Sequence, residues 1–179
     1  MNGVRLDRWT VTSGSNVNSR AAVVIRGAGH DWKASAEGNG PVDALYRAVD
    51  RALSDVLDGG HPQLLAYDVH ALAEGPSAEG RVTVVIGPPA TASGKRAAGR
   101  FSGEVASTNT IAASVQAYLG AINEMLGSES WTGVTAAAAE VAAERRARRR
   151  GDPGAEGGEA GAEFDDEAGS IDTTEWFNR

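Results

Sequence analysis

Short apolar and β-prone runs near the N-terminus predict three strands followed by one helix. The runs cover residues 9–12, 21–26 and 30–37, and the segment after the first run, residues 13–16, is loop-forming. Only three residues connect the second run to the third, which favours an antiparallel pair. Apolar residues at three- and four-residue steps then predict a helix from residue 41 to about residue 57. The first half of the chain is therefore predicted to be a βββα unit.

The same order repeats in the second half of the chain. Residues 64–73 and 81–86 are strand-like, and residues 98–105 form a third candidate after a loop rich in proline, glycine and alanine. A second helix is predicted from residue 108 or 109 to residue 126, capped by one of the polar residues at 107–109. Two βββα units of similar length predict an α+β domain in which two helices pack on antiparallel sheets.

The first predicted helix begins at a glycine-flanked turn, Gly38-Asn39-Gly40-Pro41. Proline suits the first helical position, and Asp43 places a carboxylate in the positive first turn. The glycines allow a close approach of backbone or ligand, and the free N–H groups of a helix N-terminus can hold an anion. An ordinary strand-to-helix turn is the simpler interpretation and stays open beside a ligand role.

Charge is unevenly distributed along the 179 residues. The chain has a formal net charge of −7, yet residues 151–179 alone carry nine acidic side chains and one basic side chain. Residues 140–150 contain five arginines and two glutamates, which partly offset the acidic segment. The net charge that remains for residues 1–139 is therefore close to zero. Such a domain has no broad electrostatic reason to bind nucleic acid or a membrane surface.

The composition also limits the chemistry that the chain can perform. It has no cysteine, which excludes disulfides and thiolate sites and fits the cytosol. Its three histidines, His30, His61 and His70, lack the spacing of a metal motif. The first 20 residues hold no apolar signal-peptide core, and no apolar run is long enough to span a bilayer. We therefore expect a soluble cytoplasmic protein without a metal or other cofactor.

Three stretches resemble the C-terminal regulatory, or LeuA dimerisation, domain of 2-isopropylmalate synthase and citramalate synthase. They are GNGPVDALYRAVDRAL, LLAYDVHALAEGPSAEGRVTVVI and STNTIAASVQAYLGAINEML, in the order and spacing of that family. The resemblance covers about residues 9–127, after an N-terminal extension of residues 1–8. It implies a pair of βββα units that dimerises and binds an end-product amino acid, leucine or isoleucine, to inhibit a catalytic barrel.

That catalytic barrel has no counterpart in this sequence. A (β/α)8 barrel takes roughly 250 residues, more than the whole chain offers. We therefore expect a free-standing regulatory domain with no enzymatic activity of its own, a homodimer that acts in trans on a partner synthase.

The resemblance also implies a set of ligand-binding residues near the dimer interface. The set joins the N-terminal turns of both helices to the first strand of the second unit and the loop that follows it. It comprises Asn39, Gly40, Pro41, Val42, Leu64, Tyr67, Ala71, Ala78, Gly80, Ser107, Thr108 and Asn109. Helix N–H groups would hold the ligand carboxylate, and small apolar walls would enclose a branched side chain. Tyr67 could instead pack against the helices as a core residue, with His70 on the opposite face of the strand in a structural role.

The sequence departs from the family pattern at two places. Family members often carry an aspartate where this chain has Ala66, and a Gly-x-Gly followed by an aspartate where it has Gly103-Glu104-Val105 and Asn109. An acidic partner for a ligand ammonium group is thus missing at two places. The alternative function is an interaction or dimerisation domain with a decayed ligand pocket, acting as a partner subunit.

Beyond residue 127 the composition changes. An Ala/Arg-rich segment, residues 128–150, predicts a helix with arginines at its C-terminal end, for which a solvated surface is a simpler role than nucleic-acid binding. Residues 151–179 are rich in glycine, glutamate and alanine and predict a disordered acidic tail. Trp176 and Phe177 near its end could dock on a partner or fold back on the domain.

Overall fold

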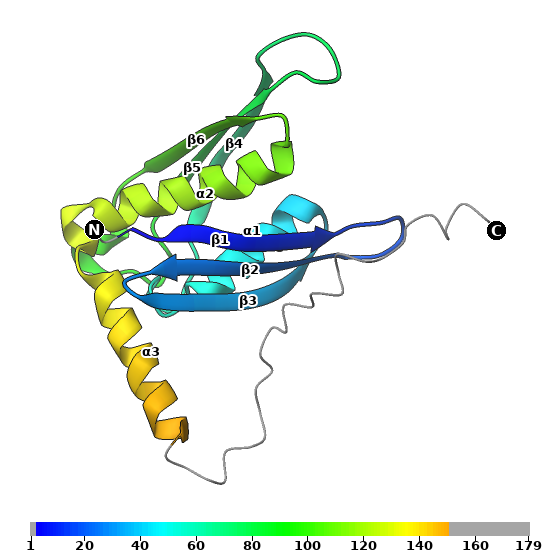
Figure 1. The fold of residues 1–179 in the computed structure, drawn as a ribbon. Coiled ribbons are helices and arrows are strands. Elements are labelled where there is room, and N and C mark those ends of the chain that lie inside the picture. Colours follow the sequence, from blue (N-terminus) through cyan, green and yellow to red (C-terminus); the bar gives the residue numbers. More distant parts are fainter. Residues whose placement is uncertain (1–2, 151–179) are drawn as a thin grey trace.

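A computed structural model describes residues 3–150 and contains two antiparallel three-stranded sheets with helices packed on them (Figure 1). The first sheet has the order β1 (Arg5–Thr12), β2 (Ser19–Gly27), β3 (His30–Gly38), and the second has the order β4 (Gln63–Ala71), β5 (Gly80–Gly87), β6 (Phe101–Ser107). The α-helices are α1 (Pro41–Ala52), α2 (Thr110–Gly127) and α3 (Val134–Arg150), with short 3-10 turns η1 (Gly94–Ala97) and η2 (Glu129–Trp131). The predicted α+β fold of two βββα units is confirmed. The tail with Trp176 and Phe177 lies outside the described residues.

Tertiary pairing moves several predicted boundaries. β1 begins at Arg5, so part of the segment predicted as an N-terminal extension is strand, because Leu6 pairs with Ile25 of β2. α1 ends at Ala52, five residues before the predicted end. The apolar stripe nevertheless continues through turns, and Leu53, Val56 and Leu57 are all fully buried. Apolar spacing therefore predicted burial correctly but not the end of the helical backbone.

The two core helices run in the same direction and touch each other. The ring of Tyr46 in α1 stacks on that of Tyr118 in α2, with centroids 4.1 Å apart. The Tyr46 hydroxyl donates to the carbonyl oxygen of Ser114 at 3.2 Å, and the Tyr118 hydroxyl donates to Asp50 at 2.6 Å. Both contacts advance by four residues along each helix, so α1 and α2 are parallel. Both helices consequently begin at the same end of the domain.

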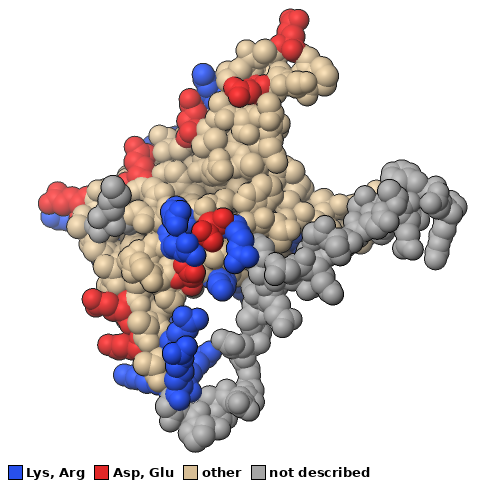
Figure 2. Space-filling view, viewed as in Figure 1, with Lys and Arg blue, Asp and Glu red and all other residues tan. Residues whose placement is uncertain are grey.

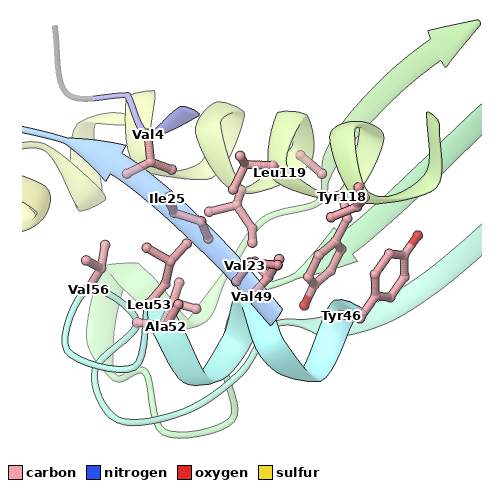
Figure 3. Packing of buried hydrophobic residues seen from close by; sticks show 14 of the residues in the cluster. Val4, Val23, Ile25, Tyr46, Val49, Ala52, Leu53, Val56, Tyr118 and Leu119 are labelled. Atoms are coloured by element: carbon pink, nitrogen blue, oxygen red, sulfur yellow. The ribbon is translucent and has the colours of Figure 1, made fainter. Parts of the chain in front are cut away.

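One apolar core joins the two units (Figure 3). Val23 and Ile25 of β2 point toward Val49 and Leu53 of α1, while Leu119 of α2 covers the same space (Figure 3). All but Leu119 are fully buried, and Leu119 is 4% exposed. The two units are therefore parts of one folding domain rather than separate modules.

Glycine allows α2 to lie directly on β6. A Cβ at Gly103 would overlap the carbonyl oxygen of Ala117, and a Cβ at Gly120 would lie 3.5 Å from the Gly103 Cα atom. The first glycine of the family's Gly-x-Gly pattern thus has a packing role here. Val105 stands at the second position, half-buried against the core.

α3 packs through its N-terminal half, where Val134, Ala138 and Ala139 are buried. Its C-terminal half is largely exposed, and Figure 2 shows basic side chains gathered at its end. One of them, Arg145, forms a 3.0 Å ion pair with Asp55. Among residues 3–150, no helix is long and apolar enough to cross a membrane.

Candidate ligand site at the paired helix N-termini

The first wall of the candidate site is the N-terminal turn of α1. Gly40 is the N-cap residue and supplies no side-chain cap, while the Asp43 carboxylate accepts the Asn39 N–H at 2.9 Å and pairs with Arg47 at 3.0 Å. The Asn39 hydrogen bond, and then Arg47, lower the pKa of Asp43. A Cβ at Gly40 would meet no atom within 4 Å, whereas one at Gly38 would overlap backbone atoms of α1. Gly38 is therefore required for packing, and the surface beside Gly40 is open.

The second wall is the N-terminal turn of α2. The Asn109 side-chain oxygen accepts the Ala112 N–H at 3.0 Å, and the Ser107 hydroxyl accepts the Asn109 N–H at 3.1 Å. Thr108 between them is exposed. A neutral amide serves as well as a carboxylate for such a cap, which accounts structurally for asparagine at this position.

Strand pairing brings three predicted residues from separate stretches to the end of the second sheet beside the start of α2. Ala71 pairs with Gly80, and Gly80 pairs with Ser107, so the three lie in one row across β4, β5 and β6. A Cβ at Gly80 would lie 3.6 Å from the Thr110 methyl group at the start of α2. The row is thus adjacent to the N-terminal turn of α2.

Tyr67 of β4 contacts α2 at Ser114, one helical turn after the start of that helix at Thr110. Its hydroxyl oxygen is 2.8 Å from the Ser114 hydroxyl oxygen, and its ring meets Tyr46 edge to face at a centroid distance of 6.4 Å. Ser114 donates its own hydroxyl proton to the Thr110 carbonyl oxygen at 2.6 Å. Because a hydroxyl has one proton, Tyr67 is the donor toward Ser114, and its oxygen can still accept a hydrogen bond from a ligand.

All three tyrosines of the chain therefore meet in one cluster with Ser114 and Asp50, which we call the tyrosine cluster. Burial raises the pKa of Asp50 to about 6, against the opposing effect of the Tyr118 hydrogen bond. Burial likewise raises the pKa values of Tyr46 and Tyr118. The hydroxyl groups thus stay protonated and act as hydrogen-bond donors near neutral pH.

Comparison with known proteins identifies the domain. A family model described as the LeuA allosteric (dimerisation) domain matches residues 2–126. The chain belongs to this family.

Curated relatives of this LeuA domain are named 2-isopropylmalate synthase. That of Salinibacter ruber is 33% identical over 126 residues, which cover 70% of this chain and 21% of the relative. That of Ruminiclostridium cellulolyticum is 36% identical over 121 residues, which cover 68% of this chain and 21% of the relative. That of Nostoc sp. is 33% identical over 125 residues, which cover 69% of this chain and 21% of the relative. The chain spans about a fifth of these relatives' length and matches their C-terminal regulatory end, not the catalytic region.

Two residues of the predicted site lie apart from the others in this LeuA domain. Leu64 pairs with Ile86 at the far end of β4, seven residues from Ala71, which is about 23 Å along a strand. Ala78 lies in the β4–β5 loop, which extends away from the domain in Figure 1, and its N–H donates to Gly75 at 3.1 Å. The other ten residues lie at the two helix N-termini or along the adjoining part of the second sheet.

Sequence reasoning missed most of the tyrosine cluster. Tyr46, Ser114 and Tyr118 stand within the family-like stretches, but apolar spacing marked the two tyrosines only as helix-core positions and did not single out Ser114. Tyr67 faces the helices, and His70, paired with Arg81, lies on the other face, as strand alternation predicted. Among residues 3–150, no group of three or more metal-binding side chains is present.

Proposed function

We propose that this LeuA domain dimerises, binds a branched-chain amino acid, leucine or isoleucine, and thereby regulates a 2-isopropylmalate synthase-type enzyme in leucine biosynthesis. The observation that carries the proposal is the position of Tyr67, whose hydroxyl is held on α2 near the N-termini of two parallel helices. Helix N-termini attract carboxylates, because free N–H groups and the helix dipole both favour negative charge there.

The neighbouring surface suits an apolar side chain. Tyr67 and Val69 of β4 are 39% and 44% exposed, and Val42 of α1 is half-buried. The open space beside Gly40 leaves room for a ligand at the start of α1. A pocket of this kind discriminates by about 1 to 3 kcal/mol per methylene, which is enough to separate leucine from smaller amino acids.

The proposed regulation acts in trans and in the cytoplasm. Residues 9–127 would form the regulatory unit, followed by the helical segment 128–150 and the acidic tail 151–179. The partner would be a synthase whose catalytic barrel lies on another chain. The similarity to the regulatory end of the synthases supports a regulatory role for this domain.

Thermal unfolding with added ligands tests the binding step. Leucine, isoleucine, valine, lysine and citramalate would each be added at millimolar concentration. A ligand of the folded state stabilises it by about 2.7 kcal/mol at a hundredfold excess over Kd. We expect a selective shift with leucine or isoleucine that Tyr67→Ala and Gly40→Val abolish. Val141→Ala, an exposed side chain on α3 outside the predicted site, is the control and should keep the shift; a shift that survives the first two substitutions would contradict the proposal.

The alternative is an interaction domain that has lost its ligand and serves as a partner subunit. Val105 favours it, because this side chain packs against the core at a position where the family often has glycine. Under this alternative no amino acid would change the unfolding temperature, while the chain would still co-purify with a synthase.

A further inference from the structure

Asn39 has the surroundings in which an asparagine amide is chemically labile. It is exposed, and its side-chain amide forms no hydrogen bond with the other residues that the structure describes. It is also the only asparagine among residues 3–150 that precedes a glycine. By contrast, Asn109 caps α2 through its side-chain oxygen, and both ends of the Asn123 amide bind the backbone just before β1. The chain's other Asn-Gly pair, at residues 2 and 3, begins outside the described residues.

The backbone nitrogen of Gly40 is free to react because the hydrogen bonds of α1 begin after it. The first of them runs from the Ala44 N–H to the Gly40 carbonyl oxygen at 2.9 Å, and the Asp43 carboxylate holds the Asn39 N–H at 2.9 Å. No hydrogen bond within the described part of the chain uses the Gly40 N–H. A Cβ at Gly40 would meet no atom within 4 Å, so the space around this nitrogen is open.

We propose that Asn39 is a site of spontaneous deamidation, in which the Gly40 nitrogen attacks the side-chain Cγ atom of Asn39. The nitrogen loses its proton as the new N–Cγ bond forms, the bond from Cγ to Nδ2 breaks, and ammonia leaves, which closes a five-membered succinimide ring. Water then opens the ring at either carbonyl carbon and yields aspartate or isoaspartate, with no change of oxidation state. Glycine favours the attack because no Cβ crowds the closing ring.

Both products change the start of α1. Each places a new carboxylate in the turn where the Asp43 carboxylate already lies. Isoaspartate also adds a methylene to the backbone between β3 and α1. This turn cannot absorb a longer backbone easily, because Gly38 packs so closely that a Cβ there would overlap the Ala44 nitrogen. Deamidation should therefore add negative charge and disturb the first turn of the helix.

The effect on ligand binding rests on the proposed function, in which this turn receives the carboxylate of an amino acid. A further carboxylate in the turn repels that of the ligand and should weaken binding roughly tenfold. Deamidation needs no enzyme and accumulates with time, so Asn39 would act as a clock that reduces the ligand response of an ageing chain. The modification itself does not depend on a ligand.

Trypsin makes the modification measurable, because cleavage after Lys33 and Arg47 releases residues 34–47 as one peptide in which Asn39 is the only amide side chain. The folded chain would be incubated at pH 8, where the attacking nitrogen loses its proton more readily, and sampled over days by liquid chromatography and mass spectrometry. We expect this peptide to convert into two products with a carboxylate at position 39, of which isoaspartyl methyltransferase should methylate one. A peptide that stays unchanged in the folded chain while it converts in the urea-unfolded chain would overturn the proposal.

Two controls show whether the glycine is responsible. The tryptic peptide of residues 9–20 contains two exposed asparagines, followed by valine and serine, and should keep its amides over the same time. Gly40→Ala should slow the conversion about tenfold or more, because a Cβ raises the barrier to ring closure. Alanine fits at this position, since φ is −155° and the space is open. Equal conversion of residues 9–20, or an unchanged rate in Gly40→Ala, would refute the assignment.

Thermal unfolding tests the consequence for binding separately. The deamidated chain carries an additional negative charge, so anion exchange separates it from the unmodified chain. The unmodified chain should give the shift with leucine or isoleucine that the proposed function predicts, and both the deamidated chain and Asn39→Asp should give a smaller one. Equal shifts would contradict the effect on binding. If the unmodified chain responds to no amino acid, the proposed function fails and this effect fails with it, while the mass of residues 34–47 still decides the deamidation.

Discussion

Asp50 should make the stability of this domain depend on pH in an unusual direction. Its carboxylate is largely buried at the contact of α1 and α2, where it accepts the Tyr118 hydroxyl. Burial raises its pKa from 3.8 to about 6, against the opposing effects of the Tyr118 hydrogen bond and of the nearby His61. An acid that holds its proton more tightly in the folded than in the unfolded chain stabilises the fold at low pH, and this stabilisation is lost as pH rises from about 4 to about 6. The difference between the two pKa values corresponds to about 3 kcal/mol.

Urea unfolding of wild type and Asp50→Asn between pH 4 and pH 7 measures this effect. The amide keeps an acceptor for Tyr118 but cannot ionise, so the two proteins should be about equally stable at pH 4. At pH 7 the variant should be more stable by about 2 to 3 kcal/mol, with the difference developing between pH 4 and pH 6. Asp55→Asn, which removes an exposed carboxylate paired with Arg145, is the control and should show no such gain. A difference that does not change with pH, or a variant less stable than wild type at pH 7, would refute the reasoning.

Two further changes test how α2 is packed and capped. Gly103→Ala should lower the free energy of unfolding by about 1 to 3 kcal/mol, because its Cβ would overlap the Ala117 carbonyl oxygen; Gly127→Ala, where a Cβ meets no atom within 4 Å, is the control and should not lower it. Asn109→Ala should cost about 1 kcal/mol by removing the acceptor for the Ala112 N–H, whereas Asn109→Asp should keep the cap. Thermal unfolding measures all four variants. An unchanged Tm for Gly103→Ala would contradict the close approach of α2 to β6, and one for Asn109→Ala would contradict the cap.

The tyrosine cluster links the two βββα units, so the proposed binding of a ligand at Tyr67 would act on both of them. The Tyr67 hydroxyl binds Ser114 of α2, whose carbonyl oxygen binds Tyr46 of α1, and Tyr46 stacks on Tyr118. A ligand that moves Tyr67 therefore acts on the contact between the two helices.

Local sequence determined the order of elements and much of the capping chemistry. Strand alternation and helical spacing depend only on neighbouring residues, so the repeated βββα order was readable before any tertiary contact was known. Pro41 begins α1 as its fixed φ requires, and Asn109 proved to be the cap among the three polar candidates before α2. Alternation also placed Tyr67 and His70 on opposite faces of one strand.

Only the tertiary structure decided where those elements end and which side chains meet. α1 stops at Ala52 although its apolar spacing continues, because turns can bury Leu57 as well as a helix can. The tyrosine cluster joins residues 46, 67 and 118, separations at which no local pattern specifies contact. Their meeting follows from the parallel packing of α1 and α2 and from the fit of α2 on β6, both of which depend on the shape of the whole core.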